Sequence, residues 1–255
     1  MAKTLASFAM AAALGLSSAL ATAPAAYALD DAQKKEIGDF IREYLLQNPE
    51  ILFEVQDAMQ AKQQAERLAK ANAVISDNKD AIFNDKNDLV LGNPNGNVTV
   101  VEFYDYNCGY CKRAITDMQA LIKSDDQIRF VLKEFPILGP DSVAAHRVAM
   151  AVRALAPEKY GDFHMALLGG QAHADEATAI SVAKNLGVSE DDIRTQMKEG
   201  NGDDEIRQSY ALADSLGING TPAYVVGNEL ISGAVGLDTL TNKVANMREC
   251  GKASC

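Results

Sequence analysis

The chain has 255 residues, 47% of them hydrophobic, and its 35 acidic against 24 basic residues give a net charge of −11 at pH 7. This length supports one full-sized domain with an appendage and a substantial core. The acidity argues against nucleic acid and anionic membrane surfaces as partners, because like charges repel.

The first 28 residues have the pattern of a cleavable export signal. One positive charge, Lys3, precedes an Ala- and Leu-rich stretch that closes on Ala26-Tyr27-Ala28, a small-x-small cleavage site. A membrane anchor is the alternative, but this stretch is weakly apolar, and no later apolar run is long enough to span a bilayer. We therefore expect residues 1–28 to be a signal peptide and the mature protein to begin at Leu29 in the periplasm.

Residues 29–84 are predicted to form helices ahead of the main domain. Apolar residues recur at helical spacing between Ile37 and Leu45. Asn48-Pro49 interrupts this pattern; Asn is a good N-cap and Pro fits a first helical position, so a second helix is expected to start there. Two short helices cannot bury such stripes alone. Either they fold back on the main domain, or they pair with a second copy of the chain; the polar sequence that follows favours self-association into a homo-oligomer.

The main domain, residues 85–255, is predicted to be a mixed α/β fold. Runs of β-branched and aromatic residues, bounded by turn residues, predict strands at 89–91, 98–104, 128–135, 223–226 and 229–231. Helices are expected at 108–122 and 237–248. Helical patterns from about 141 to 216 form a large insert. The plan is therefore strand–helix–strand, a helical insert, then a hairpin and a helix.

The chemical centre of the sequence is Cys108-Gly109-Tyr110-Cys111. It follows a buried strand and opens a helix, so unpaired backbone N–H groups and the helix dipole are expected to stabilise a thiolate at Cys108. Cys111 lies one turn further in, where it can attack the first sulfur once a mixed disulfide has formed. We expect Cys108 to carry the chemistry and Cys111 to release the client, the two forming a redox-active disulfide.

Lys112 and Arg113 follow directly, and we expect them to add positive charge near the thiolate. Lowering the pKa of a thiol changes its attack rate little, because intrinsic nucleophilicity falls with pKa, but it stabilises the reduced form. The motif therefore favours a protein that accepts electrons from client thiols or rearranges their disulfides.

A metal site and an inert crosslink are the alternatives for the CxxC. Zinc normally takes four N or S ligands. The other cysteines, Cys250 and Cys255, lie far along the chain, and His146, His164 and His173 are scattered without ligand spacing. We expect those histidines to be surface or packed residues. No metal site and no cofactor is predicted, although copper capture by the reduced thiols stays open.

Cys250 and Cys255 enclose four residues at the end of the chain. We expect them to form a structural disulfide that ties down the tail, a loop closure contributing about 2 kcal/mol in the chain-entropy model. A second redox pair is the alternative, but these cysteines lack the helix-opening setting of a reactive thiol.

The block Gly92–Lys112 (GNPNGNVTVVEFYDYNCGYCK) resembles the DsbA family of thioredoxin-fold proteins, and within it the ScsC-like and dimeric DsbA-like members. Tyr44–Leu52 (YLLQNPEIL) is similar to the leader helix through which those proteins oligomerise. The resemblance covers the whole chain after the leader, although the helical insert is matched only by layout. It implies a thioredoxin fold with an inserted helical subdomain and an N-terminal oligomerisation segment.

The resemblance also implies a client-docking loop. In the family a cis-proline loop faces the CxxC, and Gly220-Thr221-Pro222 matches it. Without the resemblance, Pro222 could be an ordinary turn proline at the start of a strand. Thr221, together with Gly109 and Tyr110 between the cysteines, is more similar to disulfide isomerases than to strongly oxidising monomers.

Two charged residues are expected to assist the thiols. Glu102 lies six residues before Cys108, where the thioredoxin fold places a buried acid that relays protons for Cys111; a carboxylate facing water at a strand edge is the alternative. Lys133, in the next strand, is predicted to be its charge partner. Asp105 and Tyr106 are expected to shape the loop before Cys108.

These observations predict a periplasmic thiol–disulfide oxidoreductase with disulfide isomerase activity. Its partners would be unfolded or mispaired exported proteins and a membrane protein that sets its redox state. A DsbA-like dithiol oxidase is the first alternative, and a copper-binding resistance protein is the second.

Overall fold

The computed structural model describes residues 29–200 and 202–255, so the predicted signal peptide lies outside the described residues. The chain divides into two units, one ending at Ala58 and one spanning Met59–Cys255, and each is described by itself. The predicted domain boundary at residue 85 stays a prediction. Within the described residues, no helix combines the length and apolar character needed to cross a membrane.

The first unit is helical, as predicted. Helix α1 (Asp31–Gln47) begins in a capping box between Asp30 and Gln33. Helix α2 (Glu50–Asp77) follows the Asn48-Pro49 break, and its residues after Ala58 belong to the second unit. The predicted capping role of Asn48 was wrong. Its backbone N–H and its side-chain amide both donate to the carbonyl of Tyr44, at 2.9 and 2.8 Å, so the side chain of Asn48 closes α1. Asn48 contacts the first turn of α2 through its backbone carbonyl, which accepts the N–H of Ile51 at 3.2 Å.

The second unit is built on a five-stranded sheet. Its strands run in the order β1-β3-β2-β4-β5, with β2 and β3 parallel and the other neighbours antiparallel. They are β1 (Leu89–Gly92), β2 (Val98–Tyr104), β3 (Ile128–Glu134), β4 (Ala223–Val226) and β5 (Glu229–Ser232). All five lie within a residue or so of their predicted positions, because each pairs β-branched or aromatic runs with flanking turn residues.

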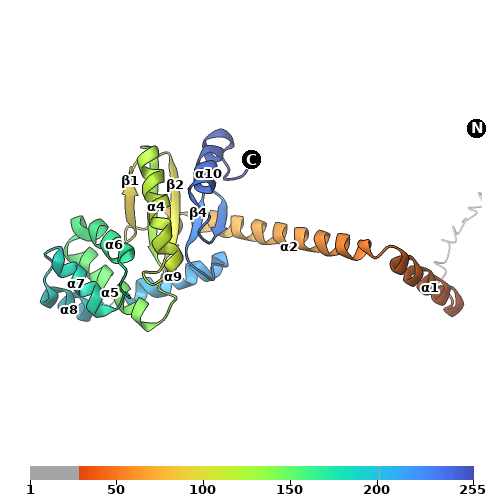
Figure 1. The fold of residues 1–255 in the computed structure, drawn as a ribbon, viewed down its shortest axis with the longest axis horizontal. Helices are drawn as coiled ribbons and strands as arrows, with labels where there is room; N and C mark the ends of the chain where they lie inside the picture. Colours follow the sequence, from red (N-terminus) through yellow and green to blue (C-terminus); the bar gives the residue numbers. More distant parts are fainter. Residues whose placement is uncertain (1–28, 201) are drawn as a thin grey trace, which may run out of the picture. The chain divides into compact units, whose positions relative to one another are not determined.

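Both faces of the sheet are covered. Helices α4 (Gly109–Ser124) and α10 (Leu237–Cys250) pack on the larger apolar core, where alternate residues such as Val100 and Phe130 point. The short helix α3 (Lys79–Phe83) and α9 (Asp203–Leu216) pack on the smaller core of the other face, around Phe103 and Val131. Figure 1 shows α4 in front of the sheet of this unit, where it contacts β3 and β1.

The helical insert lies between β3 and β4, as predicted. Before α9 it consists of α5 (Pro140–Leu155), a 3₁₀ turn (Pro157–Lys159), α6 (Tyr160–Gly169), α7 (Glu176–Asn185) and α8 (Glu190–Glu199). Two of the three histidines are fully buried in it: the Nδ1 of His146 lies 2.9 Å from a carboxylate oxygen of Glu134, and His164 packs edge to face on Tyr104. His173 is exposed.

Candidate active site

Cys108 lies between the end of β2 and the start of α4. Cys108 is the N-cap residue of α4, in an extended conformation, and its Sγ accepts the backbone N–H of Cys111 at 3.3 Å. Cys108 is 5% exposed and Cys111 is fully buried. Both are free thiols. One sulfur is therefore within reach of the surface, while the other lies one turn inside.

The two thiols have opposite acidities. The pKa of Cys108 is lowered from 9.0 to about 6, chiefly by a hydrogen bond from the Cys111 side chain, with further help from Thr221 and the backbone N–H groups of Tyr110 and Cys111. Burial opposes this shift without cancelling it. The pKa of Cys111 is raised, because burial penalises its thiolate and Cys108 and Glu102 lie nearby. At pH 7 about nine-tenths of Cys108 is ionised while Cys111 keeps its proton.

A cis-proline loop faces Cys108. The peptide bond between Thr221 and Pro222 is cis, and the carbonyl of Thr221 lies 3.2 Å from the Sγ of Cys108, although 113 residues separate them. The carbonyl of Pro222 accepts the N–H of Gly233, which holds the loop against the β4–β5 hairpin. Tyr110, between the cysteines, is 61% exposed and lies under the guanidinium of Arg113 at 4.2 Å.

Glu102 is buried on the α4 face of the sheet, so the alternative of a water-facing carboxylate does not hold. Its register partners in β3 and β4 are Leu132 and Tyr224. Burial raises the pKa of Glu102 from 4.5 to about 8, and the nearby charges of Cys108 and Asp117 add to the effect. A carboxyl group with this pKa can take up and return a proton near neutral pH.

The predicted pairing of Lys133 with Glu102 was wrong. Lys133 is the register partner of Phe103, and side chains alternate along a strand, so Lys133 points to the opposite face of the sheet from Glu102. There its ammonium forms a buried ion pair with Asp88 at 2.6 Å. Burial raises the pKa of Asp88 to about 7, against the attraction of Lys133.

Lys112 also acts differently from the expectation. Its ammonium donates to the carbonyls of Gly170 and Ala172, at 2.8 and 3.2 Å, in the loop between α6 and α7. The acidity of Cys108 therefore rests on local hydrogen bonds, and Lys112 ties the start of α4 to the helical insert.

The sequence did not predict a second set of hydrogen bonds between the active-site turn and the helical insert. The fully buried carboxylate of Asp105 accepts from the hydroxyl of Ser142 at 2.8 Å, and the side chain of Asn107 bonds both Ser142 and the backbone of Ala174. Asp105 was expected to shape this loop. Asn107 and Ser142 gave no signal, because their roles depend on contacts between segments distant in the sequence.

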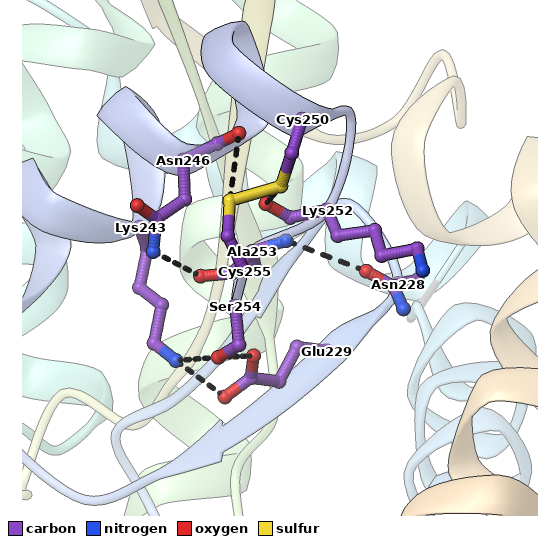
Figure 2. Close-up of a disulfide and its surroundings, with 9 residues drawn as sticks. All are labelled: Asn228, Glu229, Lys243, Asn246, Cys250, Lys252, Ala253, Ser254 and Cys255. Carbon is purple, nitrogen blue, oxygen red and sulfur yellow. Dashed lines mark hydrogen bonds and ion pairs between the residues drawn. A yellow bond between two sulfur atoms is a disulfide. The ribbon is translucent and has the colours of Figure 1, made fainter.

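The C-terminal cysteines form a disulfide, Cys250–Cys255, with Cα atoms 6.3 Å apart (Figure 2). The tail that it closes is fixed to the hairpin and to α10. Ala253 is fully buried, and Ser254 bonds both Glu229 and Lys243, at 2.7 and 2.6 Å. Within residues 29–200 and 202–255, no group of three or more His, Cys, Asp or Glu side chains is arranged to hold a metal ion.

Several solved structures are similar to this chain. A thioredoxin-like oxidoreductase from Silicibacter pomeroyi DSS-3 is 43% identical, over 68% of this chain and 99% of that one, with a TM-score of 0.64. The thiol-disulfide exchange protein alpha-DsbA2 from Wolbachia pipientis is 35% identical, over 71% and 98%, with a TM-score of 0.66. A linker-deletion mutant of Proteus mirabilis ScsC is 26% identical, over 85% and 95%, with a TM-score of 0.61.

Curated relatives include Na⁺/H⁺ antiporters of Salinispora tropica and Salinispora arenicola, both 26% identical, and the chain spans about a quarter of their length. Two family models match different parts of the chain. The copper resistance protein ScsC N-terminal domain matches residues 33–66, which include most of α1, and the DSBA-like thioredoxin domain matches residues 99–245, which include both thiols and the cis-proline loop. With a dithiol at a helix start, a cis-proline beside it and this match over more than half its length, the chain belongs to the DsbA-like family of thioredoxin-fold thiol–disulfide oxidoreductases.

Proposed function

We propose that this protein exchanges disulfides with exported client proteins and acts as a disulfide isomerase. The observation that carries the proposal is the Cys108 thiol, with its pKa of about 6, held 3.2 Å from the carbonyl of Thr221 beside a cis-proline. A thiolate that is stable at neutral pH is both a ready nucleophile and a good leaving group.

The exchange conserves electrons. The Cys108 thiolate attacks one sulfur of a client disulfide, a mixed disulfide forms, and the other client sulfur leaves as a thiolate that takes up a proton. A different client thiolate then attacks the mixed disulfide, forms a new client disulfide and returns Cys108 as its thiolate. If the client stalls, Cys111 gives its proton to a base, a role for which Glu102 is suited by its pKa, and its thiolate attacks the Cys108 sulfur. The bond to the client breaks, the client leaves as a reduced thiolate that takes up a proton, and the protein is left with an oxidised Cys108–Cys111 disulfide.

Client binding would use the surface around the thiol. Thr221, held in place by the cis peptide bond to Pro222, would present its backbone to an extended client segment, as in strand addition. Gly109 is exposed and adds no side chain beside Cys108, and the exposed ring of Tyr110 offers an apolar contact. These contacts are mostly with backbone, which suits an enzyme acting on unfolded chains of varied sequence.

Self-association through α1 is part of the proposal. Ile37, Phe40, Ile41 and Tyr44 form an apolar stripe on α1 whose members are between 44% and 66% exposed. A short helix with an exposed apolar stripe is unstable in water unless a partner covers the stripe. A second copy of the chain supplies an identical stripe.

The leader sequence and the cysteines support a periplasmic location. The first 28 residues have the pattern of a cleavable signal peptide, and an exposed disulfide such as Cys250–Cys255 persists in an oxidising compartment. We therefore place the protein in the periplasm, where a membrane reductant would keep Cys108 reduced for isomerisation.

A dithiol oxidase is the second candidate, favoured by the same acidity of Cys108. A pKa of about 6 stabilises the reduced protein at pH 7 by about 1.4 kcal/mol, which makes the disulfide more oxidising by about 30 mV. A quinone-linked membrane partner would then keep the pair oxidised.

Two refolding assays separate the candidates. In the first assay, the full-length protein acts on scrambled ribonuclease in a reducing buffer. In the second, the protein is oxidised beforehand and then acts on reduced ribonuclease. The isomerase proposal expects unscrambling that Cys108→Ser abolishes and Phe40→Asp weakens. Rapid oxidation of reduced ribonuclease without unscrambling would refute the isomerase proposal and support the dithiol oxidase. Unchanged activity of Cys108→Ser in both assays would refute thiol exchange at this site.

A further inference from the structure

The turn that presents Cys108 is fixed by Asp105. Between the end of β2 and the start of α4, the carboxylate of Asp105 accepts the backbone N–H of Asn107 at 2.7 Å, and its carbonyl accepts the N–H of Cys108 at 3.0 Å. This is the geometry in which an aspartate mimics a backbone turn. The direction in which the chain delivers Cys108 to the helix start therefore depends on where the Asp105 side chain is held.

The Asp105 side chain is held from the helical insert. It is fully buried, and its carboxylate also accepts the N–H of Leu138 at 2.9 Å and the hydroxyl of Ser142 at 2.8 Å. A buried carboxylate without hydrogen bonds is costly, so each of these donors constrains its position. Ser142 lies 37 residues further along the chain, in the first turn of α5.

Ser142 is also the link to Asn107. Its hydroxyl accepts the side-chain N–H of Asn107 at 2.9 Å while donating to Asp105, so both of its hydrogen-bonding roles are used at the active-site turn. Asn107 in turn pairs with the N–H and the carbonyl of Ala174, at 2.8 and 2.9 Å. Ser142 is fully buried. The N-cap of α5 is Gly139 and no side chain caps this helix, so the hydroxyl of Ser142 does not cap its own helix.

We propose that Ser142 is a positioning residue for Cys108: its hydroxyl holds Asp105 and Asn107, and through them the turn that presents the reactive thiol at the start of α4. The Sγ of Cys108 accepts the N–H of Cys111 at 3.3 Å, a contact that favours the thiolate, and hydrogen bonds to sulfur weaken when such distances and angles drift. Loosening the turn weakens the contacts that stabilise the thiolate.

The test titrates the Cys108 thiolate by its absorbance near 240 nm in the full-length reduced protein. Ser142→Ala removes both hydrogen bonds, and we expect the pKa of Cys108 to rise by roughly half a unit to one unit, a loss of about three- to tenfold in thiolate stability. The equilibrium with glutathione should move toward the protein disulfide by up to about the same factor. Ser142→Thr keeps the hydroxyl and should restore both values.

Ser209→Ala is the matched control. Its hydroxyl donates to the carbonyl of Glu134 at 2.6 Å, so this variant also loses a hydrogen bond from the helical insert, but one that does not reach the active-site turn. It should lower the melting temperature without moving the pKa of Cys108. If Ser142→Ala does not fold, Asn107→Ala breaks the same link from the other side and should raise the pKa likewise.

The inference rests on the proposed function, but the two can fail separately. A wild-type Cys108 with the pKa of an ordinary thiol would undermine the proposed function. Two results would overturn the positioning role of Ser142 and leave thiol exchange intact, provided that the wild-type pKa of Cys108 is lowered. In the first, this pKa changes by less than 0.2 units in Ser142→Ala, or in Asn107→Ala if Ser142→Ala does not fold. In the second, it rises equally in Ser209→Ala.

Discussion

Replacing Glu102 by Gln should stabilise the protein while impairing its chemistry. The carboxyl group is buried beneath α4, and its pKa is raised from 4.5 to about 8, first by burial and then by the charges of Cys108 and Asp117. A raised carboxyl pKa means that the folded state binds the proton more tightly than the unfolded state does. The stability associated with Glu102 is therefore greatest below pH 4.5 and is lost as pH rises toward 8.

The magnitude follows from the two pKa values. Relative to acidic solution, the loss is about 1 kcal/mol at pH 5, about 3 kcal/mol at pH 7 and approaches about 5 kcal/mol above pH 8. Gln does not titrate, so Glu102→Gln escapes this loss. The difference in unfolding free energy between variant and wild type should grow by about 2.5 kcal/mol between pH 5 and pH 7.

Urea unfolding of both reduced proteins at pH 5, 7 and 8.5 measures this difference. The chain has no tryptophan, so far-ultraviolet circular dichroism is the suitable signal. In the same variant, the attack of Cys111 on the mixed disulfide should release the client more slowly at pH 8, because Gln cannot accept the proton of Cys111. A stability difference that is constant across this pH range would refute the assignment of a raised pKa to Glu102.

Three further predictions concern other parts of the molecule. Replacing both Cys250 and Cys255 by Ser should cost about 2 kcal/mol of stability in chemical denaturation and leave ribonuclease unscrambling unchanged; lost activity would instead indicate a second redox pair. Burial lowers the pKa of His164 from 6.5 to about 3, so the stability linked to this group is present above pH 6.5 and lost as pH falls toward 3. Wild type should lose about 2 kcal/mol relative to His164→Leu between pH 7.5 and pH 5 in urea unfolding, and parallel pH profiles would argue against it. Phe40→Asp should reduce the mass measured by light scattering to that of a monomer, whereas an unchanged mass would show that α1 does not mediate association.

The sequence predicted most of the fold because its signals are local. Strands such as Val98–Tyr104 are dense in β-branched and aromatic residues, and Gly and Pro mark the breaks between helices. The position of Cys108 was predictable for the same reason, since a CxxC placed after a buried strand defines its own helix start. Asn48 was assigned to the wrong helix end, because a side chain between two helices can bond to either one.

The site residues that were missed depend on contacts between distant segments. Ser142 is an unremarkable residue in the first turn of a helix, and only the packing of α5 beside the active-site turn gives its hydroxyl a role. Lys112 carries the charge that the sequence suggested, but the carbonyls of Gly170 and Ala172 lie within its reach. Such pairings follow from the placement of the helical insert, which local patterns do not specify.

The displacement of Lys133 has a functional consequence. Had Lys133 faced Glu102, the adjacent ammonium would have favoured the carboxylate and lowered the pKa of Glu102 below its value of about 8. Because the pleat turns Lys133 to the other face, where Asp88 pairs with it, Glu102 is left among apolar neighbours with its pKa at about 8. A shift of a single residue along β3 therefore separates a structural ion pair from the buried carboxyl group that we propose as the proton acceptor for Cys111.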